Sequence, residues 1–290
     1  MLTGCVVNIS EGRDPATLAA LDATVAPLLL DRHRDPDHHR AVYTLIGPAD
    51  EVARGVRSLA RAAVARLDLS LHQGAHPRLG VLDVVPFIPY DPGRPPPTDL
   101  HAPQGPLAPV GLRDDFARWL GHELGVPSFL YGPLPGGRTR TLPYIRRHAF
   151  AELAPDNGPG RPHPSAGACA VGARSVLVAY NVWVSSPEVA RQVAPLVRGP
   201  AVRALGLAVG ARAQVSCNLI DPQRFGPGRL YDLVAAEAAR AGGGVEGAEL
   251  VGLLPRSVLY DIAEHRWPEL DLSDGRTVEA RLERLTGPAG

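Results

Sequence analysis

The stretch AVYTLIGPADEVARGVRSLARAAVARL, residues 41–67, and the run VLDVV at residues 81–85 decide the fold class. Residues 41–46 form an apolar run of strand length, and apolar side chains then recur at helical spacing from Val52 to Leu67. The run at 81–85 is almost wholly apolar and is bounded by glycine and proline, which is typical of a buried strand. A strand, a helix and a buried strand in succession predict an α/β fold.

The same alternation extends in both directions from this stretch. A strand is expected at residues 5–9, and Asp14 followed by Pro15 predicts a capped helix that runs to about Thr24. Ser186 and Pro187 repeat that cap-then-proline pattern. Further strands are expected at 28–30, 175–184, 202–208, 214–218 and 250–254, and further helices at 112–124, 230–240 and 256–262. The pattern predicts two α/β subdomains, residues 1–174 and 175–290, with helices outside the sheets.

Composition excludes several classes of protein. The 30 basic and 30 acidic residues give a net charge of zero, which argues against nucleic acid or a membrane surface as a partner. All of the basic residues are arginine, so chemistry that needs a lysine amine, such as a Schiff base or a Walker-type phosphate loop, is excluded. Three scattered cysteines and the lack of a signal peptide or a long apolar segment predict a cytoplasmic protein.

Two loops rich in proline interrupt the pattern. Seven prolines fall between Asp91 and Val110, and we interpret this segment as a surface loop. The second loop, residues 154–167, carries polar side chains spaced as if to line a site.

Histidines gather in two clusters in the first half of the chain. His33, His38 and His39 alternate with aspartates, which would suit a divalent ion, but structural histidines are commoner than ligands and no metal is expected. The second cluster ends in His76, which we interpret as a general acid and base because its ordinary pKa of about 6.5 suits proton transfer at neutral pH. By itself, a hydrogen-bonded loop histidine would be the commoner explanation.

Motifs along the whole chain resemble the formiminotransferase family, which includes glutamate formiminotransferases and the N-terminal part of formiminotransferase-cyclodeaminase. The segments that carry the resemblance are CVVNISEG at 5–12, RAVYTLIGP at 40–48, GAHPRLGVLDVVPFIP at 74–89, LYG at 130–132, RTLPYIR at 140–146, APDNGP at 154–159, GAR at 172–174, QVSCNL at 214–219 and ELVGLLP at 249–255. The length also fits a family member without the cyclodeaminase part.

The resemblance implies a fold and a reaction. Two α/β subdomains would face each other through mixed sheets, with helices outside and a trough between them. The reaction would transfer a formimino group from N-formiminoglutamate to N5 of tetrahydrofolate, with or without a polyglutamate tail, in histidine degradation. His76 falls on the family's catalytic histidine, and residues 158–167 fall on its folate-binding loop.

The expected site residues follow from this match and from the chemistry of the substrates. Arginine forks suit the carboxylates of glutamate and folate. The expected substrate-binding residues are Asn8, Glu11, Arg78, Arg140, Arg146, Asp156, Gly158, Pro159, Gly160, Arg161, Pro162, His163, Pro164, Ser165, Ala166 and Gly167, with Arg174 as a further candidate. Supporting roles are expected for His33, Asp37 and Asp83, although Asn8 and Glu11 could equally cap a turn.

Departures from the family pattern keep other functions open. Ala75 stands where a glutamate is common, Arg161 and Ala166 replace bulky apolar residues of the mammalian members, and His33 replaces an aspartate. The alternatives are formyl transfer between N-formylglutamate and 5-formyltetrahydrofolate, a non-catalytic folate-binding paralogue, and a metal-dependent amidohydrolase. Small-molecule substrates are expected, and a homodimer is left open.

Overall fold

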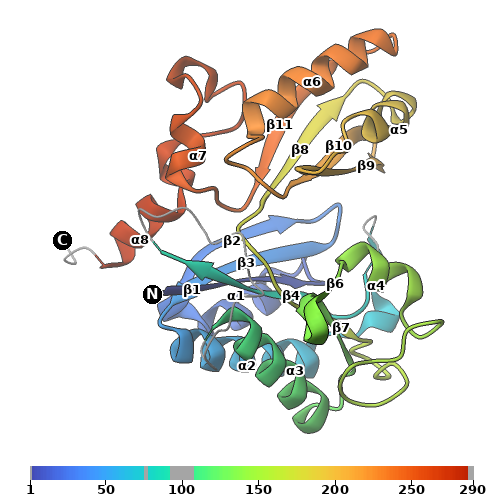
Figure 1. Ribbon diagram of the computed structural model, residues 1–290, viewed down its shortest axis with the longest axis vertical. Coiled ribbons are helices and arrows are strands. Elements are labelled where there is room, and N and C mark those ends of the chain that lie inside the picture. Colours follow the sequence, from blue (N-terminus) through green and yellow to red (C-terminus); the bar gives the residue numbers. More distant parts are fainter. Residues whose placement is uncertain (1, 75–77, 92–107, 287–290) are drawn as a thin grey trace. The chain divides into compact units, whose positions relative to one another are not determined.

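The computed structural model describes residues 2–74, 78–91 and 108–286, and the chain divides into two compact units, Met1–Ser175 and Val176–Gly290 (Figure 1). Each unit is built on one β-sheet with helices packed on it. The predicted α/β class with two sheets is therefore confirmed. The helices in the described part of the chain include none that is long and apolar enough to cross a membrane.

The first unit contains a seven-stranded mixed sheet. Its strands are β1 (Leu2–Ile9), β2 (Leu29–Asp35), β3 (Arg40–Gly47), β4 (Leu82–Tyr90), β5 (Ser128–Leu134), β6 (Arg138–Arg140) and β7 (Cys169–Ala173). They lie in the order β2-β3-β1-β4-β7-β5-β6, and β7 runs parallel to both β4 and β5 while the other pairs are antiparallel. The segment that carries His76 leads directly into β4, near the middle of this sheet.

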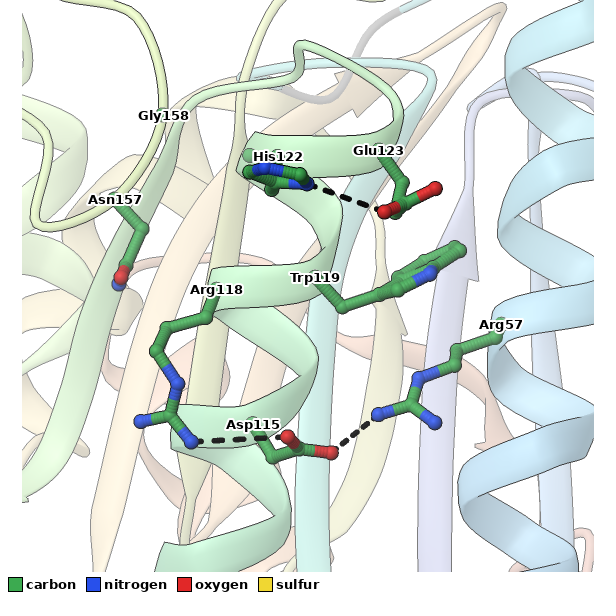
Figure 2. Close-up of a pocket in the computed structure, with 9 residues that line it drawn as sticks. Arg57, Asp115, Arg118, Trp119, His122, Glu123, Asn157 and Gly158 are labelled. Carbon is green, nitrogen blue, oxygen red and sulfur yellow. Dashed lines mark hydrogen bonds and ion pairs between the residues drawn. The ribbon is translucent and has the colours of Figure 1, made fainter.

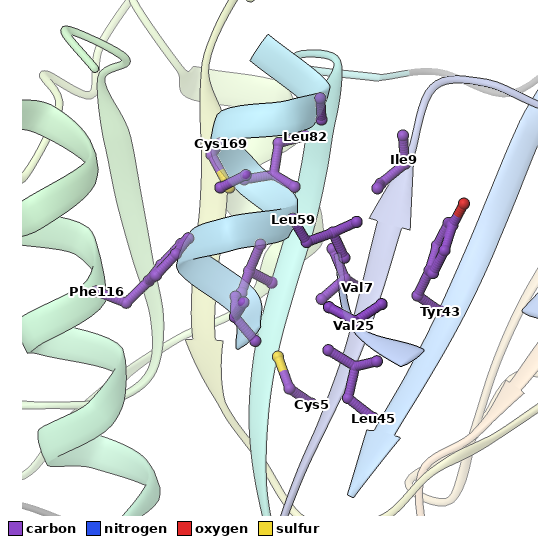
Figure 3. Close-up of a cluster of buried hydrophobic side chains, with 14 of the residues drawn as sticks. Cys5, Val7, Ile9, Val25, Tyr43, Leu45, Leu59, Leu82, Phe116 and Cys169 are labelled. Carbon is purple, nitrogen blue, oxygen red and sulfur yellow. The ribbon is translucent and has the colours of Figure 1, made fainter. Parts of the chain in front are cut away.

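Helices α1 (Pro15–Ala23), α2 (Ala49–Arg66) and α3 (Pro109–Glu123) cover one face of this sheet (Figure 1). Figure 3 shows the apolar core between these helices and the sheet, in which Cys5, Leu59 and Phe116 are fully or almost fully buried. A smaller apolar cluster joins helix α4 (Leu142–His148) to strands β4, β5 and β7 through Ile145. The sheet is thus a rigid support for the loops at its edges.

The second unit contains a four-stranded sheet in the order β11-β8-β10-β9, antiparallel throughout. Its elements are β8 (Val178–Val184), α5 (Pro187–Leu196), β9 (Val202–Val209), β10 (Arg212–Leu219), α6 (Pro227–Arg240), β11 (Val245–Val251), α7 (Arg256–Tyr260) and α8 (Val278–Thr286). Helices α5 and α6 pack against the sheet, and its own core contains Tyr180, Val215 and Leu230.

The capped helices begin where the sequence predicts. The Asp14 carboxylate accepts hydrogen bonds from the backbone N–H groups of Ala16 and Thr17, and Ser186 Oγ accepts one from Val189. The prediction for the buried run at 81–85 was too short, because β4 continues through Pro86 and Pro89 to Tyr90. Strands β5, β6 and β7 and helices α4 and α8 were not predicted.

Candidate active site

Two consecutive backbone carbonyls in the turn between β2 and β3 bind Arg78. The carbonyl of His38 accepts a hydrogen bond from Arg78 Nη2 at 2.9 Å, and that of His39 accepts one from Nη1 at 3.2 Å. His72 Nε2 lies 2.5 Å from the same Nη1, and the rings of His39 and His72 lie against each other with centroids 4.3 Å apart. The turn therefore ties down both His72 and Arg78, the residues on either side of the segment that carries His76.

Positive charge is concentrated around Arg78. Burial lowers the pKa of its guanidinium, Asp83 raises it, and the nearby arginines Arg40, Arg146 and Arg13 lower it again. Burial also lowers the pKa of His39 and of His72, and Arg78 adds to both effects. Both imidazoles are therefore held neutral near pH 7, and an anion bound here would relieve the repulsion between the guanidinium groups.

Buried Asp83 and half-buried Arg146 form an ion pair at the start of β4. Arg146 Nη2 donates to Asp83 Oδ2 at 2.6 Å, Nη1 reaches Oδ1 at 3.3 Å, and the Leu79 N–H donates to Oδ1 at 2.6 Å. Asp83 is 2% exposed. The carboxylate thus fixes helix α4, which carries Arg146, against the chain that follows Arg78. A supporting role of Asp83 in the reaction stays a prediction.

The predicted folate loop, residues 158–167, ends directly against the chain that follows Arg78. The Val81 N–H donates to the Ala166 carbonyl at 3.0 Å, the Ala168 N–H donates to that of Leu79 at 3.0 Å, and Gly80 pairs with Gly167 in a β-bridge. A Cβ atom on Gly80 would lie 2.2 Å from the Ala168 carbonyl oxygen. The end of the loop and residues 79–81 therefore meet backbone to backbone, and only glycine allows the approach.

His163 organises the loop itself. Its Nδ1 accepts hydrogen bonds from the backbone N–H groups of Ser165 at 3.3 Å and Ala166 at 3.0 Å, and its backbone pairs with Gly167 in both directions. Ala166 and Gly167 are buried and Ser165 is half-buried. The loop residues exposed to solvent are Gly158, Pro159, Gly160, Arg161, Pro162 and Pro164.

Other predicted binding residues have structural partners. Arg140 Nη1 forms an ion pair with Asp156 Oδ2 at 2.5 Å, and the Leu130 N–H donates to the same oxygen, so this pair secures β5. Glu11 Oε1 accepts hydrogen bonds from the N–H groups of Arg13 and Asp14, and Asn8 Nδ2 donates to the Val6 carbonyl. Substrate contacts of these four predicted residues stay predictions.

The histidine and aspartate strip is divided between a strand and a turn. His33 lies in β2 opposite Val42, Asp37 is exposed in the turn, and His38 is buried with Nε2 3.6 Å from Asp35 Oδ2. Residues 2–74, 78–91 and 108–286 bring no three histidine, cysteine or acidic side chains together in a way that could hold a metal ion. The supporting roles of His33 and Asp37 stay predictions.

A hollow of 660 Å³ lies on the outer side of α3, beside the start of the predicted folate loop (Figure 2). The charged side chains that line it form ion pairs with one another. Asp115 binds both Arg57 and Arg118, and His122 Nδ1 lies 3.1 Å from Glu123 Oε1. Gly121 of α3 packs on Gly158 so closely that a Cβ on Gly121 would lie 2.7 Å from the Gly158 Cα. This contact anchors the start of the loop.

His76, the predicted catalytic residue, and Ala75 lie outside the described residues, as does most of the proline-rich segment 91–110. His39, His72 and Arg13 also lie close to Arg78, and the sequence predicts no substrate contact for any of the three. His39 adopts the left-handed conformation, with a φ of +49°. The sequence holds a signal for this turn, because histidine, like asparagine and aspartate, is enriched in that conformation and Asp37-His38-His39 stands between two strands.

Comparisons with known proteins agree on one family. The family model described as the formiminotransferase domain, N-terminal subdomain, matches residues 2–174. The chain is 32% identical to glutamate formimidoyltransferase of Streptococcus pyogenes serotype M1 over 90% of this chain and 91% of that protein. It is 30% identical to glutamate formimidoyltransferase of Thermoplasma acidophilum over 98% of both chains. It is 35% identical to formimidoyltransferase-cyclodeaminase of Sus scrofa, of which it spans about half, 52%.

Proposed function

The chain belongs to the formiminotransferase family, and we propose that it transfers a formimidoyl group from N-formimidoyl-L-glutamate to N5 of tetrahydrofolate. The observation that carries this proposal is the backbone contact between Gly80 and Gly167. It joins the loop expected to bind folate to the chain that follows the expected catalytic histidine.

The proposed mechanism needs one proton shuttle. Tetrahydrofolate supplies the nucleophilic nitrogen N5, and the formamidinium carbon of the donor is electrophilic because the group is protonated at neutral pH. His76 takes the proton that N5 releases on attack and gives it to the glutamate nitrogen before the old carbon–nitrogen bond breaks. The protons balance, and the products are glutamate and the 5-formimidoyl folate.

Arg78 is proposed to bind a substrate carboxylate. Its guanidinium is bound to two carbonyls of the β2–β3 turn, so its orientation is fixed before substrate arrives. Burial lowers the pKa of Arg78 and the surrounding arginines lower it further, so a carboxylate beside it would be bound more strongly than in a neutral, solvated setting. Arg146 shares its charge with Asp83 and is proposed as a second, weaker contact.

A donor panel on the native protein and on His76→Ala tests the proposal. We expect tetrahydrofolate-dependent release of glutamate from N-formimidoylglutamate by the native protein, with a fall of about 10² to 10⁴-fold in kcat for the variant. N-formylglutamate is the second donor in the panel. No turnover of formimidoylglutamate by the native protein would refute the substrate assignment, and full activity of His76→Ala would refute the role of the histidine.

A further inference from the structure

The hydroxyl of Ser10 is buried just beyond the end of β1 and binds the chain that enters β4. Ser10 is 4% exposed, and it directly follows Ile9, which lies opposite Leu82. Its Oγ donates to the Gly80 carbonyl at 2.8 Å, and its backbone N–H donates to the Val81 carbonyl at 2.8 Å. One serine therefore holds two consecutive peptide groups that are distant from it in the sequence.

The peptide group between Gly80 and Val81 is held from opposite sides. A trans peptide directs its C=O and its N–H in opposite directions. Ser10 Oγ binds the Gly80 carbonyl oxygen, while the Val81 N–H of the same peptide donates to the Ala166 carbonyl at 3.0 Å. The hydroxyl of Ser10 and the end of the predicted folate loop therefore fix the orientation of one peptide plane.

Gly80 leaves this orientation to its neighbours. Glycine has no Cβ and populates backbone conformations that are closed to other residues. The contact needs a glycine, because a Cβ at this position would lie 2.2 Å from the Ala168 carbonyl oxygen and 2.4 Å from that of Ala166. A buried carbonyl without a donor is also costly. Ser10 supplies that donor and so restrains the peptide on the side away from the loop.

The hydrogen bonds continue from this peptide into the loop. The Ala166 N–H donates to His163 Nδ1 at 3.0 Å, and the backbones of His163 and Gly167 pair in both directions. Because a backbone N–H donates to Nδ1, the ring of His163 carries its proton on Nε2. A chain of hydrogen bonds thus runs from Ser10 to the His163 side chain, and bonds linked in this way strengthen one another.

We propose that Ser10 is a positioning residue for the folate loop. Its hydroxyl fixes the peptide group between Gly80 and Val81, which in turn holds residues 163–167 in the conformation that binds folate. The inference rests on the proposed function, because it takes residues 158–167 as the folate-binding loop. Ser10 is assigned no contact with substrate, and it acts on the binding of folate and not on that of the formimidoyl donor.

Three substitutions separate positioning from simple packing. Ser10→Ala removes the hydroxyl and leaves the Gly80 carbonyl without this donor, whereas Ser10→Thr keeps a hydroxyl at the same position. Ser128→Ala is the matched control. Ser128 is also a fully buried serine of the first unit, but its Oγ has no hydrogen-bond partner among the described residues. Thermal midpoints are measured on all three variants.

We expect the KM for tetrahydrofolate and the Kd of 5-formyltetrahydrofolate to rise about 10-fold in Ser10→Ala. Both constants should stay within about threefold of the native values in Ser10→Thr and Ser128→Ala. The KM for formimidoylglutamate should change less than about threefold in every variant, because a loss of folding stability alone would not single out one substrate. Native folate binding by Ser10→Ala, or an equal rise in KM for both of its substrates, would overturn the proposal.

Amide hydrogen exchange of single residues tests the same geometry without turnover or ligand. The Val81 amide should exchange about 10-fold faster in Ser10→Ala than in the native protein and in Ser128→Ala. Unchanged exchange at Val81 would overturn the role of Ser10. If the native protein transfers no formimidoyl group, the proposed function fails, while the exchange of Val81 still decides whether Ser10 holds the end of the loop.

Discussion

Arg78 in the first unit and Arg266 in the second show opposite effects of environment on an arginine. Burial and neighbouring arginines lower the pKa of Arg78. Hydrogen bonds to Asp232 raise that of Arg266, whose Nη1 and Nη2 donate to the two carboxylate oxygens at 3.0 and 2.7 Å. The positive charge of Arg266 is already neutralised within the fold, whereas that of Arg78 would be stabilised further by an incoming anion.

The same contrast holds for the surroundings of the two arginines. Arg78 lies among backbone carbonyls, two histidine rings tilted against each other, a left-handed turn and glycines in close contact with backbone atoms. In the second unit Arg256 resembles Arg266, because hydrogen bonds to Glu283 raise its pKa. Strained backbone occurs often at functional sites, whereas exposed ion pairs contribute little to stability.

The largest expected effect comes from adding a side chain at Gly80, where the backbone touches the folate loop. Gly80→Ala would place a Cβ 2.2 and 2.4 Å from two backbone oxygens, so we expect a loss of about 4 kcal/mol or more in the free energy of unfolding. Gly199 of the second unit also forms an isolated bridge, but a Cβ there meets nothing within 4 Å. Gly199→Ala should stay within about 0.5 kcal/mol of the native value in urea titrations. Similar losses in both variants would contradict the close contact.

Removing one carboxylate in each unit should reduce stability by different amounts in the two units. Asp83→Asn leaves Arg146 without its buried counterion, so we expect a loss of about 3 kcal/mol in unfolding free energy. Asp232→Asn removes an exposed counterion of Arg266 and should cost at most about 1 kcal/mol. Thermal and urea denaturation measure both. The account of Asp83 fails if its variant is as stable as that of Asp232.

Substitution of Arg78 should lower the transfer activity, whereas substitution of Arg266 should not. A charge-assisted hydrogen bond contributes about 1.5–3 kcal/mol, so Arg78→Gln should lower kcat/KM about 10 to 10²-fold. Arg266→Gln should leave kcat/KM unchanged. Steady-state assays with formimidoylglutamate and tetrahydrofolate measure both constants. A similar kcat/KM for the two variants would mean that the contrast between the arginines has no functional meaning.

The smallest expected effect is a difference in pH dependence. His39 and His72 have pKa values below the ordinary 6.5 because they are buried, so their contribution to stability is complete above about pH 6.5 and falls as the pH drops toward the lowered values. The pKa of Glu283 lies below its ordinary 4.5, so its contribution is lost only in more acidic solution. Hydrogen exchange at about pH 7.5 and 5.5, corrected for intrinsic rates, should show weakening of the first unit alone. Equal weakening of both units would count against buried, neutral histidines.

Local sequence signals predicted the helices better than the strands. Asp14-Pro15 and Ser186-Pro187 carry their own caps, so their helix starts could be located from neighbouring residues alone. The extent of β4 could not be predicted from neighbouring residues in this way. Pro86 is registered with Gly172 of β7, and Pro89 with Thr3 of β1 beyond the point where β7 ends, so sheet pairing decides that these prolines continue the strand.

The site could be predicted only in part, because some of its features are local in the sequence and others depend on contacts between distant segments. The motif around Arg78 and the folate loop stand out in the sequence, and Asp83 lies within that motif. The ring contact of His39 with His72 joins a left-handed turn to a residue 33 positions later, and the contact of Gly80 with Gly167 depends on the β4–β7 pairing. Contacts between distant segments leave little trace in one sequence.

The central claim is that the functional site lies where residues 79–81 meet the end of the loop formed by residues 158–167. Hydrogen exchange of the native protein with and without 5-formyltetrahydrofolate, a stable relative of the expected product, tests it most directly. We predict that the ligand slows exchange in both of these segments. Slower exchange confined to residues 118–123 beside the outer hollow, or to the second unit, would contradict the account.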